Sequence, residues 1–195
     1  MNLQPLFEIQ RKLDEKIVKK KGLEGRNILP EMFLALQVEI GECANEWRGF
    51  KVWSNDQKPR LRRVVSVNGF DTNDNPKYEY ENPLLEEYVD GLHFFLIIAL
   101  GVFPESRIEF ISANAEFKDV TQDVLSCFDH LFYKVGEFHF LYKNHGAFDE
   151  MDVYFSKLLT FYFGLGKSLG FSWEQIEQAY LDKNKINHTR QESGY

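Results

Sequence analysis

The stretch from Pro83 to Gly101 constrains the fold more than any other part of the sequence. It opens with Asn82-Pro83, a pair typical of a helix cap and first turn, and from Leu92 to Leu100 it is apolar on almost every side. A helix without a polar face must be covered by other elements. The apolar run is also too short to span a bilayer, since Gly101, Val102 and Phe103 follow it and Pro104 comes next. We therefore predict a central helix buried in a bundle, and no association with a membrane.

Helical periodicity continues along most of the chain. Apolar residues recur three or four positions apart, and glycine, proline or capping residues separate the periodic segments. The other helices that these signals predict cover residues 6–21, 30–47, 119–143 and 149–165, and a last one opens at the capping box Ser172-x-x-Gln175. We predict an all-α fold in which residues 1–195 form one domain.

One segment, at about residues 58–82, departs from this pattern. It is rich in Asn, Asp, Pro and β-branched residues, which favour strands and turns over helices. Val64–Val67 and Tyr78–Tyr80 can pair as a short hairpin. We interpret the segment as an irregular or β insertion that projects from the helical body.

Charge and cysteine content narrow the possible function classes. The formal net charge of −7 disfavours a protein that binds nucleic acid, because binding to a phosphate backbone normally needs a basic surface. The amino terminus has no apolar segment typical of a signal peptide. Cys43 and Cys127 lie in helical patterns without zinc-ligand spacing, and we interpret both as core residues. These features predict a cytoplasmic protein.

Two acidic pairs are the strongest candidates for a functional site. Glu39 and Glu42 are three residues apart in one predicted helix, and Glu87 and Asp90 are three apart in the next. Residues at this spacing share a helix face, so each pair can direct two carboxylates at one point. Carboxylate oxygens favour Mg²⁺, with Mn²⁺ as an alternative. The competing interpretation is exposed acid at a helix start, where the helix dipole favours negative charge.

Complementary groups follow in the sequence. Lys183, Asn187 and Arg190 share one face of the last predicted helix and can bind successive phosphates, although a solvated basic helix end gives the same pattern. His93 and Phe94 share the face of Asp90, where the histidine can hydrogen-bond to a base and the phenylalanine can stack on it. An aromatic residue in an apolar run is, however, usually part of the core.

Three motifs in order resemble a known family. They are the run from Glu39 to Ser54, EIGECANEWRGFKVWS; the run from Leu85 to Phe94, LEEYVDGLHF; and the carboxy-terminal KNxxNxxRQxxGY that begins at Lys183. Together with the amino-terminal FEIQRKLD, they resemble the dimeric, all-α dUTPases, which belong with the MazG-like nucleotide pyrophosphatases. The resemblance covers most of the chain except residues 58–82.

The resemblance implies a fold, a reaction and a set of site residues. It implies a MazG-like helical bundle that hydrolyses dUTP to dUMP and pyrophosphate with a water molecule activated by Mg²⁺, and a homodimer. The metal ligands would be Glu39, Glu42, Glu87 and Asp90, with Glu39 and Glu42 as catalytic residues. The substrate-binding residues would be Gln10, Trp53, His93, Phe94, Lys183, Asn187, Arg190 and Tyr195, and Lys51 could assist.

Two alternatives remain open at this stage. A MazG-like enzyme that acts on another nucleoside triphosphate would carry the same acidic pairs. A non-catalytic helical bundle could instead bind a regulatory protein through the 58–82 insertion, which is shorter in many relatives.

Overall fold

The computed structural model describes residues 1–70, 75–144 and 148–193 of the chain. Within these ranges it contains seven helices and a two-stranded antiparallel sheet, so the predicted all-α fold with a short β insertion is confirmed. The elements are α1 (Gln4–Lys21), α2 (Leu29–Trp47), β1 (Arg63–Phe70), β2 (Pro76–Glu81), α3 (Pro83–Val102), α4 (Glu105–Asn114), α5 (Val124–Asn144), α6 (Phe148–Ser168) and α7 (Trp173–Ser193).

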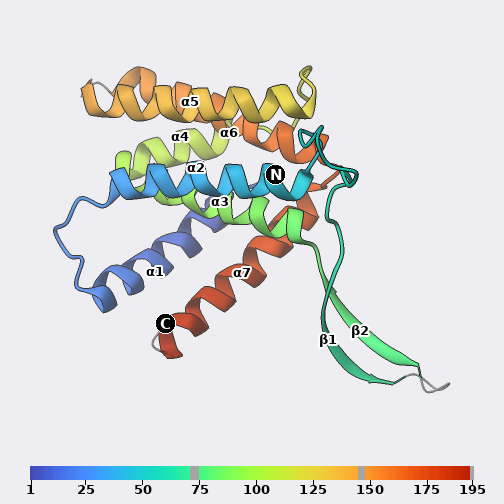
Figure 1. Cartoon of the computed structure of the whole chain (residues 1–195). Coiled ribbons are helices and arrows are strands. Elements are labelled where there is room, and N and C mark those ends of the chain that lie inside the picture. Colours follow the sequence, from blue (N-terminus) through green and yellow to red (C-terminus); the bar gives the residue numbers. More distant parts are fainter. Residues whose placement is uncertain (71–74, 145–147, 194–195) are drawn as a thin grey trace.

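Helix α3 occupies the middle of the bundle. It packs along α2, while α1 and α7 lie together on one side of this pair and α5 and α6 on the other (Figure 1). Its side chains from Leu92 to Ala99 are buried apart from the half-buried Phe94 and Ile97, as the apolar run predicts. The side-chain oxygen of Asn82 accepts a hydrogen bond from the Leu85 amide at 3.1 Å and caps the helix.

The structure differs from the sequence prediction in one additional helix and in the start of another. Helix α4 was not predicted: its stretch carries only two buried apolar residues, Ile108 and Ile111, and is too short for a clear period. Helix α5 begins at Val124 instead of residue 119. The reason is that the Asp123 side chain accepts a hydrogen bond from the Ser126 amide at 3.0 Å, which makes Asp123 the capping residue.

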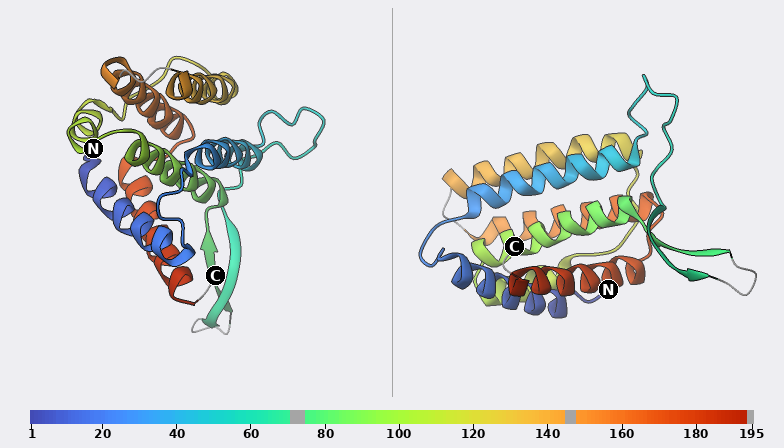
Figure 2. Two further views of the ribbon diagram at one scale, coloured as in Figure 1. Left: turned by 90° about the vertical axis from the view of Figure 1, so that its left-hand side faces the viewer. Right: turned by 60° about the horizontal axis from the view of Figure 1, so that its bottom comes forward.

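The insertion forms the expected hairpin. Strands β1 and β2 pair with Val64 opposite Tyr80 and Val67 opposite Tyr78, and the hairpin extends away from the helices (Figures 1 and 2). Every described residue of β1 is exposed, and β2 is exposed up to its last residue. The hairpin therefore adds no side chains to the buried core.

Cys43 and Cys127 are both free and buried, in agreement with their assignment to the core. None of the helices in the described ranges is long and apolar enough to cross a membrane.

Candidate functional site

The packing of α2 against α3 brings the acidic pairs together. Carboxylate oxygens of Glu39, Glu42 and Glu87 all lie within 4.8 Å of one another. This arrangement follows from the sequence, because the three-residue spacing places each pair on the face that its helix turns toward the other. Asp90 lies one helical turn beyond Glu87 and contributes to the same electrostatic environment.

The electrostatics of this acidic cluster are unfavourable without a cation. Burial, followed by the charges of Asp90, Glu42 and Glu87, raises the pKa of Glu39 to about 7. Burial and the neighbouring carboxylates likewise raise the pKa of Glu87 to about 7. Half-buried carboxylates this close together cannot all stay ionised at neutral pH unless positive charge compensates them.

One compensating charge comes from the protein. The Lys183 ammonium on α7 donates hydrogen bonds to Asp90 at 2.6 Å and to Glu86 at 3.0 Å. Burial lowers the pKa of Lys183, but the hydrogen bonds and charges of Asp90 and Glu86 outweigh it and raise the pKa above its usual value. The sequence assigned Lys183 to phosphate binding and did not predict its ion pair with Asp90, because the two residues are 93 positions apart.

The remaining three carboxylates fit a divalent metal ion. Glu39, Glu42 and Glu87 offer only oxygen donors, their ligand atoms are close enough to share one ion, and their net charge is negative. Mg²⁺ and Mn²⁺ prefer this ligand chemistry, whereas zinc and copper sites usually include nitrogen or sulfur.

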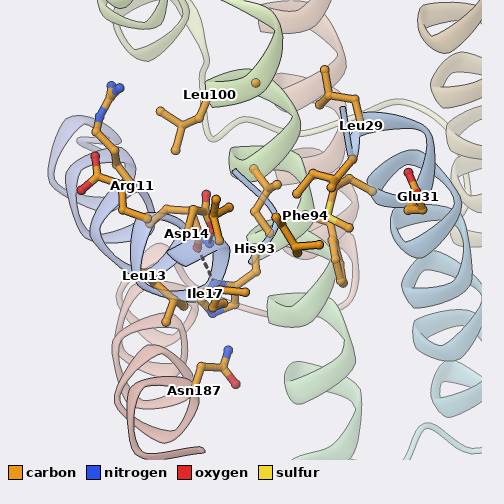
Figure 3. Close-up of a pocket in the computed structure, with 18 of the residues that line it drawn as sticks. Arg11, Leu13, Asp14, Ile17, Leu29, Glu31, His93, Phe94, Leu100 and Asn187 are labelled. Carbon is orange, nitrogen blue, oxygen red and sulfur yellow. Dashed lines mark hydrogen bonds between the residues drawn. The ribbon is translucent and has the colours of Figure 1, made fainter. Parts of the chain in front are cut away.

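A pocket of about 1040 Å³ opens beside the cluster, between α1, α2, α3 and α7 (Figure 3). Glu39 and Asp90 belong to its wall, so the acidic cluster and the pocket are continuous. Most of its surface is apolar, which suits a planar base. The predicted site residues that line it are Gln10, Glu39, Asp90, His93, Phe94, Lys183, Asn187 and Arg190.

Gln10 and His93 form a buried polar contact in the pocket wall. The side-chain oxygen of Gln10 lies 2.7 Å from His93 Nδ1 and accepts a hydrogen bond from the Tyr180 hydroxyl at 2.6 Å. The Gln10 amide nitrogen donates to Asp14 at 2.7 Å. The His93 ring stacks on Tyr180, with 4.1 Å between ring centroids. These contacts hold both side chains in fixed orientations.

One predicted binding residue, Trp53, is not brought to the pocket: it is 74% exposed in the segment after α2 and does not line the pocket. Tyr195 lies outside the described residues, so its predicted role stays a prediction. The segment that carries Trp53 is nevertheless well fixed, because the Arg48 guanidinium donates to the Asp56 carbonyl at 2.7 and 3.1 Å. Arg48 has a φ of 65°, which a non-glycine residue adopts rarely.

Two polar residues of this site, Asp14 and Tyr180, were not predicted from the sequence. Asp14 follows Gln10 by four residues, so helix spacing could have placed both on one face. No pattern in the sequence pointed to Tyr180, which meets Gln10 through the packing of α7 on α1.

Comparisons with known proteins agree with the geometry. A search of curated proteins found no match to the chain. A family model described as dUTPase matches residues 2–67 and 72–195, which include each acidic pair, the pocket residues and the carboxy-terminal motif. The chain therefore belongs to the dUTPase family and is an enzyme of that class, a dUTP diphosphatase.

Proposed function

We propose that the enzyme hydrolyses dUTP to dUMP and pyrophosphate in a Mg²⁺-dependent reaction at the junction of the acidic cluster and the pocket. The proposal rests on one observation: the acidic cluster and the pocket are continuous. Glu39 and Asp90 face both the other carboxylates and the pocket. A deoxyuridine in the pocket would thus place its triphosphate beside the acidic cluster. The family match supports this choice of nucleotide.

Glu39, Glu42 and Glu87 would hold the metal, together with Asp90. When bound, Mg²⁺ would neutralise triphosphate charge and increase the acidity of water. Mn²⁺ could replace it, because both ions accept all-oxygen coordination.

Glu39 is the best candidate to orient and deprotonate the attacking water. It lies both on the pocket wall and in the acidic cluster, so its carboxylate can accept a proton from a water molecule beside the nucleotide. Glu42 completes the catalytic pair that the family resemblance implies. No covalent intermediate with the protein is needed.

The cations of α7 would bind the phosphates. Lys183 and Arg190 lie on the pocket wall with Asn187 between them in sequence, so a triphosphate can contact all three. Lys183 would exchange part of its interaction with Asp90 for a phosphate oxygen. Roles for Lys51 and Tyr195 rest on the family resemblance alone.

Gln10, His93, Phe94 and Asn187 would form the base and sugar subsite. Phe94 is half-buried and offers a flat apolar surface on which a pyrimidine can stack. The role of Trp53 rests on the resemblance, since the side chain is exposed away from the pocket.

We also infer a cytoplasmic homodimer. The dimer is supported by exposed apolar side chains on α2 and α5, where Leu34, Val38, Tyr133 and Phe140 face solvent. Light scattering coupled to gel filtration would measure the oligomeric state.

A second candidate function is binding of a regulatory protein. The exposed apolar residues of the β1–β2 hairpin favour it.

A substrate panel tests the main proposal. Pyrophosphate release would be measured for dUTP, dCTP, dTTP, UTP and dATP with Mg²⁺, with Mn²⁺ and with excess EDTA. We expect dUTP to be strongly preferred and EDTA to abolish turnover. Equal rates on dCTP or dTTP would instead favour a MazG-like enzyme of broader specificity. Turnover that persists in EDTA would overturn the metal requirement.

A further inference from the structure

A series of hydrogen bonds, partly buried at Asp14 and fully buried at His93, links helix α1 to the base end of the pocket. It runs from the Asp14 carboxylate to the Gln10 side-chain amide and on to the His93 ring, with lengths of 2.7 Å at both steps. All three residues belong to the pocket wall, and Asp14 and His93 are seen on it in Figure 3. The order of these groups determines which atoms donate and which accept.

The Asp14 carboxylate determines which atom of each following group donates a hydrogen bond and which accepts one. An ionised carboxylate can only accept hydrogen bonds, so the Gln10 amide nitrogen must face Asp14. The Gln10 oxygen then faces His93 and Tyr180. Because a carbonyl oxygen is an acceptor, the Nδ1 atom of His93 must carry a proton to bond with it.

The other ring nitrogen of His93 is therefore an acceptor. Burial, followed by the charge of Lys183, lowers the pKa of His93 to about 3, so the ring is neutral and holds one proton. That proton is on Nδ1, and Nε2 keeps its lone pair. His93 is 5% exposed, and Nε2 has no hydrogen-bond partner among the described residues. A buried acceptor without a partner is costly, and a ligand donor would remove the cost.

We propose that Asp14, acting through Gln10, is a specificity-determining positioning residue: it fixes His93 as the tautomer whose Nε2 accepts a hydrogen bond from N3–H of uracil. Cytosine carries a lone pair at N3 and would place two acceptors against each other. Thymine has the same N3–H group as uracil, so this device rejects cytosine and does not act on thymine. The inference rests on the proposed function, because it assumes that the base occupies this pocket.

The tautomer can be measured without turnover. A two-bond ¹H–¹⁵N correlation spectrum of the ¹⁵N-labelled enzyme, recorded at pH 8.5, shows which ring nitrogen carries the proton, and a His93→Asn variant identifies the signals. The pH is chosen because burial raises the pKa of Asp14 to about 7, and the carboxylate must be ionised. We expect the proton on Nδ1, and we expect dUMP with Mg²⁺ to shift the Nε2 resonance. A proton on Nε2, or an unchanged Nε2 resonance with dUMP bound, would overturn the proposal.

An Asp14→Asn variant tests the link to specificity. Its side chain can donate as well as accept, so Gln10 can reverse and offer its amide nitrogen to His93, which would move the proton to Nε2. Tyr180 can accommodate the reversal, since its hydroxyl also lies 3.5 Å from the Leu6 carbonyl. We expect the ratio of kcat/KM for dCTP to that for dUTP to rise about tenfold, the effect of one altered hydrogen bond. The ratio for dTTP to dUTP should stay within about twofold.

Tyr180→Phe is the matched control. It removes a hydrogen bond to the same Gln10 oxygen but leaves the order from Asp14 to His93 unchanged, so neither ratio should move. Equal changes of the dCTP and dTTP ratios in Asp14→Asn would mean a loosened pocket and would overturn the proposal. If the wild-type enzyme failed to hydrolyse dUTP, the proposed function would fail, whereas the tautomer spectrum would still test the hydrogen-bond order.

Discussion

The ammonium of Lys183 lies 2.6 Å from a carboxylate oxygen of Asp90, where the pocket meets the acidic cluster. One residue belongs to the set proposed to bind phosphate and the other to the set proposed to bind metal. Their ion pair thus connects the two halves of the site. The ion pair also means that the net charge of the acidic cluster depends on whether the Lys183 ammonium contacts Asp90 or a phosphate.

A Lys183→Gln variant should have opposite effects on nucleotide turnover and on Mg²⁺ binding. Loss of the ammonium removes a phosphate contact, so we expect kcat/KM for dUTP to fall by about a hundredfold. The same loss makes the cluster more negative, so binding of Mg²⁺ without nucleotide should tighten a few-fold. Steady-state kinetics and calorimetric titration would measure the two effects. Lys185→Gln, which removes an exposed lysine of the same helix, is the control and should change neither. Weaker Mg²⁺ binding in Lys183→Gln would contradict the charge argument.

Removing one carboxylate should abolish turnover without harming the fold. Glu39→Gln and Glu87→Gln each delete a proposed metal ligand, and we expect kcat to fall by at least about a hundredfold. Because each change also relieves repulsion between like charges, the melting temperature of the metal-free protein should stay equal or rise. Circular dichroism melting and pyrophosphate release would be compared with Glu109→Gln, an exposed change on α4. Retained turnover in both cluster variants would exclude the cluster as the metal site.

The stability of the metal-free protein should decrease between pH 6 and pH 8.5. The folded pKa of Glu39 and of Glu87 is about 7 against an ordinary value of 4.5, so the native state binds more protons than the unfolded state between these values. The resulting stabilisation is complete below about 4.5 and is lost as the pH rises through 7. Mg²⁺ should counter the loss, with a larger increase in melting temperature at pH 8.5 than at pH 6.

The histidines require a control in that experiment. The pKa of His93 is lowered by burial, which acts with the opposite sign below about 6.5. The double variant Glu39→Gln/Glu87→Gln keeps the histidines and the raised carboxyls of Asp14 and Asp90, and lacks those of Glu39 and Glu87. Its melting temperature should depend less on pH than that of the wild type, and an equal dependence would show that other groups are responsible.

Much of this site could be predicted from the sequence, and the rest depends on packing between distant segments. The acidic pairs were recognisable because helix geometry links residues three apart, and the buried helix α3 because it is apolar on all sides. The Lys183–Asp90 ion pair and the Tyr180–Gln10 hydrogen bond join residues more than 90 positions apart. Such contacts depend on how α7 crosses α1 and α3, which no local spacing encodes. The exposure of Trp53 is likewise a property of the fold and not of its motif.

The turn of α3 that carries Glu87 and Asp90 also carries Tyr88, which contacts Tyr162 of α6. The Tyr88 hydroxyl donates to the Tyr162 carbonyl at 3.0 Å, the Tyr162 hydroxyl donates to the Tyr88 carbonyl, and their rings stack with centroids 4.5 Å apart. The contact requires glycine at position 91, because a Cβ there would lie 2.5 Å from the Tyr162 hydroxyl oxygen. Gly91→Ala should therefore lower the free energy of unfolding by about 1–3 kcal/mol.

A double-mutant cycle isolates this contact. Tyr162→Phe removes the clashing oxygen, at the cost of one hydrogen bond worth about 1 kcal/mol. In Gly91→Ala/Tyr162→Phe the alanine should fit, so the two losses should be non-additive by about 1 kcal/mol or more in chemical denaturation. Additive losses would show that position 91 matters for another reason.

Replacement of residues 63–81 by a short glycine-serine linker should leave the helical body intact. The β1–β2 hairpin is exposed and shares with the body an ion pair between Arg63 and Glu86 at 3.7 Å. An exposed ion pair of this kind contributes at most about 1 kcal/mol. We expect kcat/KM for dUTP within about threefold of the wild type. A larger loss would assign the insertion a part in catalysis, for instance through the oligomeric state measured in parallel.

The position of the hairpin also makes it a practical attachment point. The chain has two cysteines and both are buried, so a Ser66→Cys variant would present a single accessible thiol on an arm that extends away from the helices (Figure 1). A fluorophore, spin label or surface tether could be coupled there by ordinary maleimide chemistry. Nucleotide binding could then be followed on single molecules without a reporter near the reacting groups.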